Sequence, residues 1–294
     1  MPSVFQVLIV VDVEGVSVEE ELLATLPDQR RDRLVLRLTD HGAPKVERHG
    51  PAPQPIDWMR IGRAIEVVAD KAIEAAKAAS GDTLHLYVGG TGPLPVFIHL
   101  GYAIKKFTGP QWVIGRRPGA AWEALPLADS NGASSLLTSS PLPDRASHAT
   151  GQVAVYLDVA ARPMNVEALR DAVELGGERL ADATELRPGE GITVTAENAG
   201  ALASEVTGKL AVLPALFPHA SSLGMFVAGP TMFAFAAGRA LNPTIVRSAR
   251  LYNYSTGKYE LVYDLPFDDQ SRAPLPADEG SLAARGAVRD GILR

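Results

Sequence analysis

Short unbroken runs of Val, Ile and Leu alternate along the chain with longer segments in which apolar residues recur at helical spacing. Residues 6–13 read Gln-Val-Leu-Ile-Val-Val-Asp-Val, and residues 152–159 read Gln-Val-Ala-Val-Tyr-Leu-Asp-Val. Continuous apolar runs of this length are typical of strands buried on both faces of a parallel sheet. Because four of the eight positions are identical, the pattern indicates an internal repeat.

A second pair of similar segments lies further along the chain. Residues 92–104 contain Gly-Pro, seven residues and Gly-Tyr-Ala-Ile, and residues 229–241 contain Gly-Pro, seven residues and Gly-Arg-Ala-Leu. Each segment lies between two strand-like runs, at residues 84–88, 112–114, 223–227 and 250–252. The two pairs have the same order and offsets of 146 and 137 residues, so we infer that the chain is an internal duplication.

Helical patterns fill the intervals between the expected strands. Asp57 can cap a helix whose apolar face contains Ile61, Ile65, Val68, Ala72 and Ala76, and further helices are expected at 165–176 and 196–209. Strands that alternate with helices predict an α/β protein of two fused Rossmann-like parallel-sheet units. We expect units at 1–125 and 151–268, a linker or long loop at 126–150 and a polar tail at 269–294.

Composition narrows the class of protein. The 294 residues include no cysteine, which excludes thiol catalysis, disulfides, thiolate zinc sites and iron–sulfur clusters and fits a cytoplasmic protein. The N-terminal apolar run lacks a basic n-region and a cleavage site, so it predicts a first strand. Residues 210–238 carry no formal charge, but Pro214, Pro218 and Pro230 interrupt them. We therefore favour a buried strand and helix there, with a membrane segment as the alternative.

The net charge of −6 hides a strong segregation. Residues 83–122 and 206–259 hold nine of the 28 Lys and Arg residues and none of the 34 Asp and Glu residues, so the remaining chain carries −15. Burial of these two segments would explain why they lack Asp and Glu, because a buried charge is costly. Burial would, however, disfavour Lys and Arg to the same extent. The pattern favours a site for a multiply charged anion, whereas the overall acidity argues against a protein that coats long DNA or RNA.

Glycine-rich segments follow two of the expected strands. In doubly wound sheets ligands lie beyond the carboxyl ends of strands, and we expect turns there at Gly89-Gly90-Thr91-Gly92 and at Ala228-Gly229-Pro230-Thr231. Backbone amides and helix N-termini at such turns favour anions. The segments match neither a GxGxxG nor a Walker pattern, so turns needed for packing are an equal alternative. Tyr252 and Tyr254 are candidates for stacking on bases.

Catalytic patterns are weak. The six His residues lack metal-ligand spacing, no GxSxG elbow is present, and no evident base accompanies Thr91, Ser221 or Ser222. Asp12 and Asp158, which end the repeated strands, are interpreted as cap or turn residues. We predict no catalytic residue, no metal and no cofactor.

The second half of the chain resembles the SAVED domain, a sensor module of bacterial antiphage systems. The resemblance rests on Leu216-Phe217-Pro218, on Pro230 before Ala237-Gly238-Arg239-Ala240-Leu241, and on Arg250-Leu251-Tyr252-Asn253-Tyr254. In the first half it rests on Leu100-Gly101-Tyr102-Ala103-Ile104, and it covers roughly residues 57–266. It implies two fused CARF-like units that bind a cyclic tri- or tetra-adenylate in CBASS or type III CRISPR defence.

By position, the resemblance implies that the ligand lies against the two turns. The expected contacts are Gly89, Gly90, Thr91, Gly92, Gly229, Pro230 and Thr231, with Lys105, Arg116, Arg117 and Arg239 on phosphates.

Members of the family are often fused to an effector, and ligand binding typically drives head-to-tail association. Here the first 50 or so residues belong to the first sheet and the tail is short. We therefore expect an effector in a separate chain and a ligand-induced homo-oligomer or filament. A ring nuclease or other nucleotide-using Rossmann enzyme, and a scaffold without a small ligand, are the alternatives.

Overall fold

The first of two sheets is built by the N-terminal part of the chain. The computed structural model describes residues 4–15, 18–27, 33–46, 55–78, 83–107, 109–116, 121–127, 136–139, 147–159, 164–192, 194–241 and 248–267. The sheet comprises β1 (Val4–Asp12), β2 (Arg33–Arg37), β3 (Thr83–Thr91), β4 (Gln111–Arg116) and β5 (Trp122–Pro126). Its strand order is β2-β1-β3-β4-β5, with parallel pairing except between β4 and β5.

The second sheet repeats this topology. It contains β6 (Leu137–Ser139), β7 (Gly151–Asp158), β8 (Leu180–Pro188), β9 (Ala220–Ala228), β10 (Ala249–Ser255) and β11 (Lys258–Leu265) in the order β11-β10-β9-β7-β8-β6. Strands β7 to β10 are parallel, and β11 and β6 are antiparallel edge strands. Apart from β6, each strand has a counterpart in the first sheet. The repeated sequence runs form β1 and β7, so the predicted α/β fold of two Rossmann-like units is confirmed.

The helices follow the same repeat. Helices α1 (Glu19–Thr25), α2 (Trp58–Ala78) and α3 (Leu94–Ala103) correspond to α4 (Val166–Leu175), α5 (Ala196–Leu216) and α6 (Thr231–Ala240), and a 3-10 turn covers Thr39–His41. Asp57 caps α2 by accepting from the Arg60 amide at 3.1 Å, as predicted. Helix α5 is longer than the predicted 196–209 because Leu210 and Leu213 are buried in the core, with Pro214 confined to the last turn.

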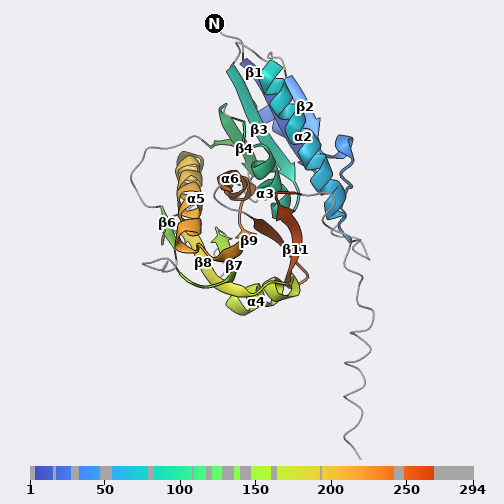
Figure 1. Cartoon of the computed structure of the whole chain (residues 1–294). Coiled ribbons are helices and arrows are strands. Elements are labelled where there is room, and N and C mark those ends of the chain that lie inside the picture. Colours follow the sequence, from blue (N-terminus) through green and yellow to red (C-terminus); the bar gives the residue numbers. More distant parts are fainter. Residues whose placement is uncertain are drawn as a thin grey trace, which may run out of the picture.

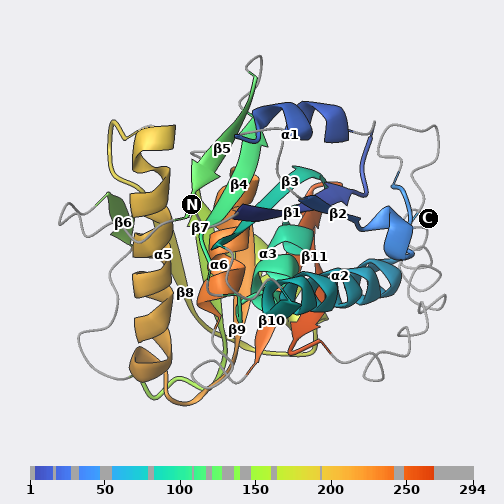
Figure 2. The same cartoon turned by 90° about the horizontal axis from the view of Figure 1, so that it is seen from above.

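The molecule is layered around four inner helices, α2, α3, α5 and α6. In the first unit, Val7 and Ile9 of β1 face α2 and α3, whereas Leu8 packs on Leu22 of α1. The second sheet is divided in the same way, with α5 and α6 on its inner face and α4 on its outer face. One continuous core therefore joins both inner faces, with α3 and α6 at the centre between the sheets (Figures 1 and 2).

Helices α3 and α6 cross at the two repeated glycines. A side chain added at Gly238 would overlap the carbonyl oxygen of Ile98, and one added at Gly101 would overlap that of Phe235. The repeated Gly-x-Ala pattern in the sequence is therefore explained by a symmetric backbone contact between the two units.

Two further segments bear on the sequence interpretation. The segment 126–150, expected to be a linker, contributes β6, which pairs antiparallel with β8. Residues 269–294 lie outside the described residues. None of the helices in the described part of the chain is both long and apolar enough to cross a membrane.

Candidate ligand-binding site

Two equivalent Gly-Pro turns connect the sheets to the central helices. Pro93 and Pro230 are the N-cap residues of α3 and α6, with φ −61° and ψ 144° at Pro93 and φ −64° and ψ 148° at Pro230. Neither helix receives a side-chain capping hydrogen bond. Both helices therefore begin with backbone N–H groups at the carboxyl edge of their sheet, which is an arrangement that favours anions.

The expected turn at residues 89–92 is largely strand. Gly89 and Gly90 pair with Val10 and Val11 of β1, and β3 continues through Thr91. Gly90 has φ +130°, and a side chain there would overlap the Val11 carbonyl oxygen. At Gly92 a Cβ would lie 2.8 Å from the Val13 side chain. Close packing therefore accounts for these glycines, because a larger residue would separate the two central strands.

The hydroxyl of Thr91 is also used within the fold, because it donates to the backbone carbonyl of Glu14. The second turn is similarly crowded. Gly229 has φ +154°, and a Cβ at this position would lie 2.8 Å from that of Val159. Pro230 is exposed and Thr231 is half-buried, so this turn presents more surface than its counterpart.

Arg116 and Tyr254 occupy corresponding positions at the carboxyl edges of the two sheets. The register pairs Gly89 with Ile114 and Met225 with Leu251, so Arg116 ends β4 near Thr91 and Tyr254 ends β10 near the second turn. Arg117 and the side chain of Arg116 lie outside the described part of the structure. Tyr254 is 51% exposed, and its ring centroid is 5.0 Å from that of Tyr259.

Tyr252 differs sharply from Tyr254. Its ring is buried and stacks on Phe226 with the centroids 4.3 Å apart, and its hydroxyl donates to Oε1 of Gln152 at 2.9 Å. Burial raises the pKa of the Tyr252 hydroxyl. Of the two predicted stacking residues, only Tyr254 is presented to solvent. Sequence reasoning missed Tyr259, its half-buried neighbour on β11, because only the strand pairing brings the two rings together.

Lys105 and Arg239 lie at the opposite ends of α3 and α6 from the Gly-Pro turns. Each helix has ten residues and is therefore about 15 Å long. The Lys105 ammonium lies 3.2 Å from the centroid of the Tyr102 ring, and burial lowers its pKa. Nη2 of Arg239 donates to the Phe107 carbonyl at 3.4 Å. These two cations are thus not brought together with the turns.

Two other cations of the acid-free segments, Arg250 and Lys258, are paired with acids. Arg250 lies 3.1 Å from Asp264 and 3.9 Å from Glu178, and Lys258 lies 3.5 Å from Glu260. Acidic side chains therefore offset part of the positive charge of these segments. Glu178 and Asp264 are distant from Arg250 in sequence and become its neighbours through the fold, whereas Glu260 lies two residues from Lys258 on the same strand, β11.

The acidic residues at the strand ends have structural roles. Asp12 accepts from the amide of Thr39 at 3.1 Å and from its hydroxyl, which confirms the predicted cap or turn role. Asp158, at the same position of the second unit, is 2% exposed. Among the residues that the structure describes, no group of three or more His, Asp or Glu side chains could hold a metal ion.

Comparison with protein families identifies the fold. Residues 68–265 match the model of SAVED, the SMODS-associated and fused to various effectors sensor domain. The chain therefore belongs to the SAVED family of sensor domains, as its sequence resemblance indicated. No curated protein matches the chain.

Solved structures with a similar fold include SAVED/CARF-domain containing Cap4 receptors. The Acinetobacter baumannii receptor with 2′3′3′-cAAA has a TM-score of 0.56 and 16% identity, and the match covers 87% of this chain and 51% of that one. The same receptor with 3′3′3′-cAAA has a TM-score of 0.53 and 17% identity, and the match covers 81% of this chain and 50% of that one. The Moraxella osloensis receptor has a TM-score of 0.51 and 18% identity, and the match covers 82% of this chain and 48% of that one. The present chain thus spans about half the length of these receptors, and at this identity the likeness shows the fold.

Proposed function

We propose that this protein is a cyclic oligonucleotide sensor of the tri- or tetra-adenylate class in bacterial antiviral defence. The observation that carries the proposal is the SAVED match over both units, combined with two equivalent uncapped helix starts in one chain. Support also comes from the similar Acinetobacter baumannii Cap4 receptor, which was solved with two cyclic trinucleotides.

The proposed site comprises the carboxyl edges of both sheets. The Gly92–Pro93 and Gly229–Pro230 turns and the first backbone amides of α3 and α6 would face the phosphates, Arg116 and Arg117 would supply charge, and Tyr254 would stack on a base. Tyr252 supports Tyr254 from within the core instead of meeting the ligand. Lys105 and Arg239 are too far along their helices to share these phosphates, so we leave them out of this site.

Signalling in this proposal is mechanical and involves no catalysis by the chain. A ring that contacts both turns would stabilise one relative position of the two units in proportion to its affinity for that state. Exposed surfaces fixed in this way would associate head to tail into an oligomer or filament. That assembly would activate an effector carried by a separate chain.

A thermal-shift screen with cyclic di-, tri- and tetranucleotides tests the proposal. A cognate ring at 100 times its Kd should stabilise the protein by about 2.7 kcal/mol. The double variant Arg116→Glu/Arg117→Glu should lose this shift while its melting temperature without ligand stays unchanged, because the charge reversal repels the phosphates. An unaltered affinity in the double variant would refute the site, and the absence of any shift across the screen would refute the function.

The fate of the ligand separates a sensor from a ring nuclease. Labelled cyclic tri-adenylate should be recovered intact after hours with the protein, and linear products would overturn the non-catalytic assignment. Sedimentation velocity with and without the ring tests association, which should appear only in the presence of the ring.

A further inference from the structure

The two units contact each other through a pair of equivalent interfaces, and these differ in how they are filled. Strands β10 and β11 of the second unit pack on α2 and α3, and strands β4 and β5 of the first unit pack on α5 and α6. We name the first of these the closed contact and the second the open contact. The equivalence follows from the repeat, which matches α2 with α5, α3 with α6 and β11 with β5.

The closed contact is filled by large side chains. His99 of α3 is fully buried, with Nε2 2.7 Å from Oε1 of Glu66 and its ring 4.8 Å from Tyr263 and 4.9 Å from Phe267. A Cβ added to Gly62 of α2 would lie 2.5 Å from the Phe267 ring. Large rings and the close approach at Gly62 therefore fill this contact.

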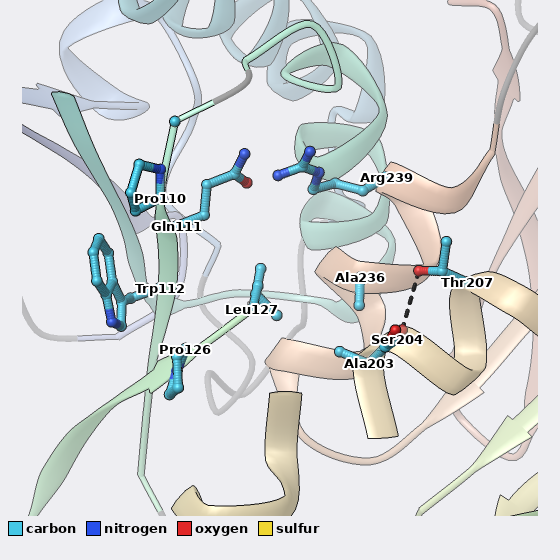
Figure 3. A pocket seen from close by; sticks show the side chains of 11 residues that line it. Pro110, Gln111, Trp112, Pro126, Leu127, Ala203, Ser204, Thr207, Ala236 and Arg239 are labelled. Carbon is cyan, nitrogen blue, oxygen red and sulfur yellow. Dashed lines mark hydrogen bonds between the residues drawn. The ribbon is translucent and has the colours of Figure 1, made fainter. Parts of the chain in front are cut away.

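The open contact contains a cavity of about 410 Å³ (Figure 3). The repeat places Ser204 at the position of Glu66 and Ala236 at the position of His99. Two small side chains therefore stand where the closed contact has a carboxylate and an imidazole. The side chains that line the cavity include Gln111, Leu127, Ser204, Thr207, Ala236 and Arg239.

The polar groups of this cavity define the chemistry of its ligand. Figure 3 shows the Gln111 amide of the first unit and the Arg239 guanidinium of the second pointing toward one another. Gln111 is only 6% exposed, its Nε2 donates to the Phe107 carbonyl at 3.0 Å, and its Oε1 has no hydrogen-bond partner among the residues that the structure describes. A buried acceptor without a donor is costly, so a ligand that brings an N–H or O–H group would relieve this cost.

Arg239 supplies a cationic group that an anion can approach from the cavity. A guanidinium pairs with phosphate through two parallel hydrogen bonds, and no Asp or Glu is among the described residues that line the cavity. The walls formed by Leu127, Ala203 and Ala236 are apolar. The volume lies in the range of small-molecule sites, about 300 to 1,000 Å³, and exceeds what a free phosphate would fill.

We propose that the open contact is a second binding site, separate from the Gly-Pro turns, for a phosphorylated nucleoside. Arg239 holds the phosphate, Oε1 of Gln111 accepts from an amino or hydroxyl group, and the apolar walls cover the base. Because Gln111 and Arg239 belong to different units, the ligand bridges them and stabilises their contact. Arg239 is too far from the Gly-Pro turns to contact a ligand there, and this second site gives it a role.

Isothermal titration calorimetry of the full chain with adenosine monophosphate tests the proposal. The wild-type protein should bind one molecule per chain. Ser204→Glu, which copies the carboxylate of the closed contact into the cavity, should weaken this binding at least tenfold. Ser204→Gln, of the same size without the charge, should weaken binding less than Ser204→Glu, and the difference between the two variants measures the effect of the charge. Val212→Glu adds the same charge two turns further along α5 at a side chain that is 45% exposed, and it should leave binding unchanged.

A crossed measurement separates this site from the cyclic oligonucleotide site. Arg116→Glu/Arg117→Glu should keep its affinity for adenosine monophosphate, and Ser204→Glu should keep its affinity for the cyclic ring. Ala236→His, which copies His99, fills the cavity by another route and should also lose the mononucleotide. The proposal would be overturned if adenosine monophosphate did not bind to the wild type, or if it bound to Ser204→Glu and Ala236→His as tightly as to the wild type. Loss of its binding in Arg116→Glu/Arg117→Glu would also overturn the proposal.

Discussion

The closed and open contacts show how one backbone arrangement, used twice, can serve different purposes. Both place a two-stranded hairpin of one unit against two helices of the other. In the closed contact His99, Tyr263 and Phe267 fill the space, whereas Ala236 in the open contact borders a cavity of about 410 Å³. The two units of the repeat therefore share their helix crossing and strand order, but they differ in the side chains next to the crossing.

The helix crossing is shared by both contacts, so disturbing it should have the largest effect. Gly238→Ala places a methyl group against the Ile98 carbonyl and should lower the free energy of unfolding by about 3 kcal/mol, as overpacking does. Urea titration followed by circular dichroism measures this change.

Gly208→Ala is the matched control, because a Cβ at this helical position meets nothing within 4 Å. It should raise the free energy of unfolding by up to about 1 kcal/mol through helix propensity. Equal effects of the two substitutions would show that the crossing is not tightly packed.

Emptying the closed contact should have the next largest effect. His99→Ala removes a fully buried ring between Tyr263 and Phe267 and should cost about 2 kcal/mol, in the range of large-to-small core substitutions. The same urea titration applies. His99→Phe retains the ring without the contact to Glu66 and should recover most of the loss. If His99→Phe proves as damaging as His99→Ala, the Glu66 contact and not packing holds this interface closed.

A smaller effect is expected from Tyr263 of the closed contact, which corresponds to Leu125 of the open one. Its hydroxyl is buried and has no hydrogen-bond partner in the described part of the chain. Tyr263→Phe should therefore raise the free energy of unfolding at pH 7 by about 1 kcal/mol.

The same tyrosine makes stability depend on alkaline pH. Burial, and to a smaller extent the Asp57 carboxylate, raises the pKa of Tyr263 well above its ordinary value. The unfolded chain therefore loses this proton near pH 10 while the folded chain keeps it, so stability is present below pH 10 and falls as the pH rises. The wild type should lose up to about 1.4 kcal/mol more per pH unit than Tyr263→Phe. Tyr254→Phe, at an exposed ring, should follow the wild-type profile; parallel profiles for all three proteins would contradict the burial of Tyr263.

The fold could be predicted from sequence because its signals are local. Continuous apolar runs mark β1 and β7, and the Gly-Pro pairs mark the starts of α3 and α6. The short strand β6 has only three residues and carries no periodic signal.

The site could be predicted only in part, because its remaining features depend on pairing between distant segments. The acidic partners of Arg250 come from strand β11 and from the connection between α4 and β8. Tyr252 and Tyr254, two positions apart, differ in exposure because Phe226 and Gln152 cover the first of them. The cavity arises because Ser204 and Ala236 are small. Their importance can be recognised only when the alignment of the two repeats shows that they replace Glu66 and His99.

A crystal structure of the full chain with 3′3′3′-cAAA, the ring seen in a Cap4 receptor of similar fold, tests the central claim most directly. The account predicts one ring per chain, in contact with the Gly92–Pro93 and Gly229–Pro230 turns of both units, and with Tyr254 on a base. A ring bound in the cavity beside Arg239, or a separate ring on each unit, would contradict it.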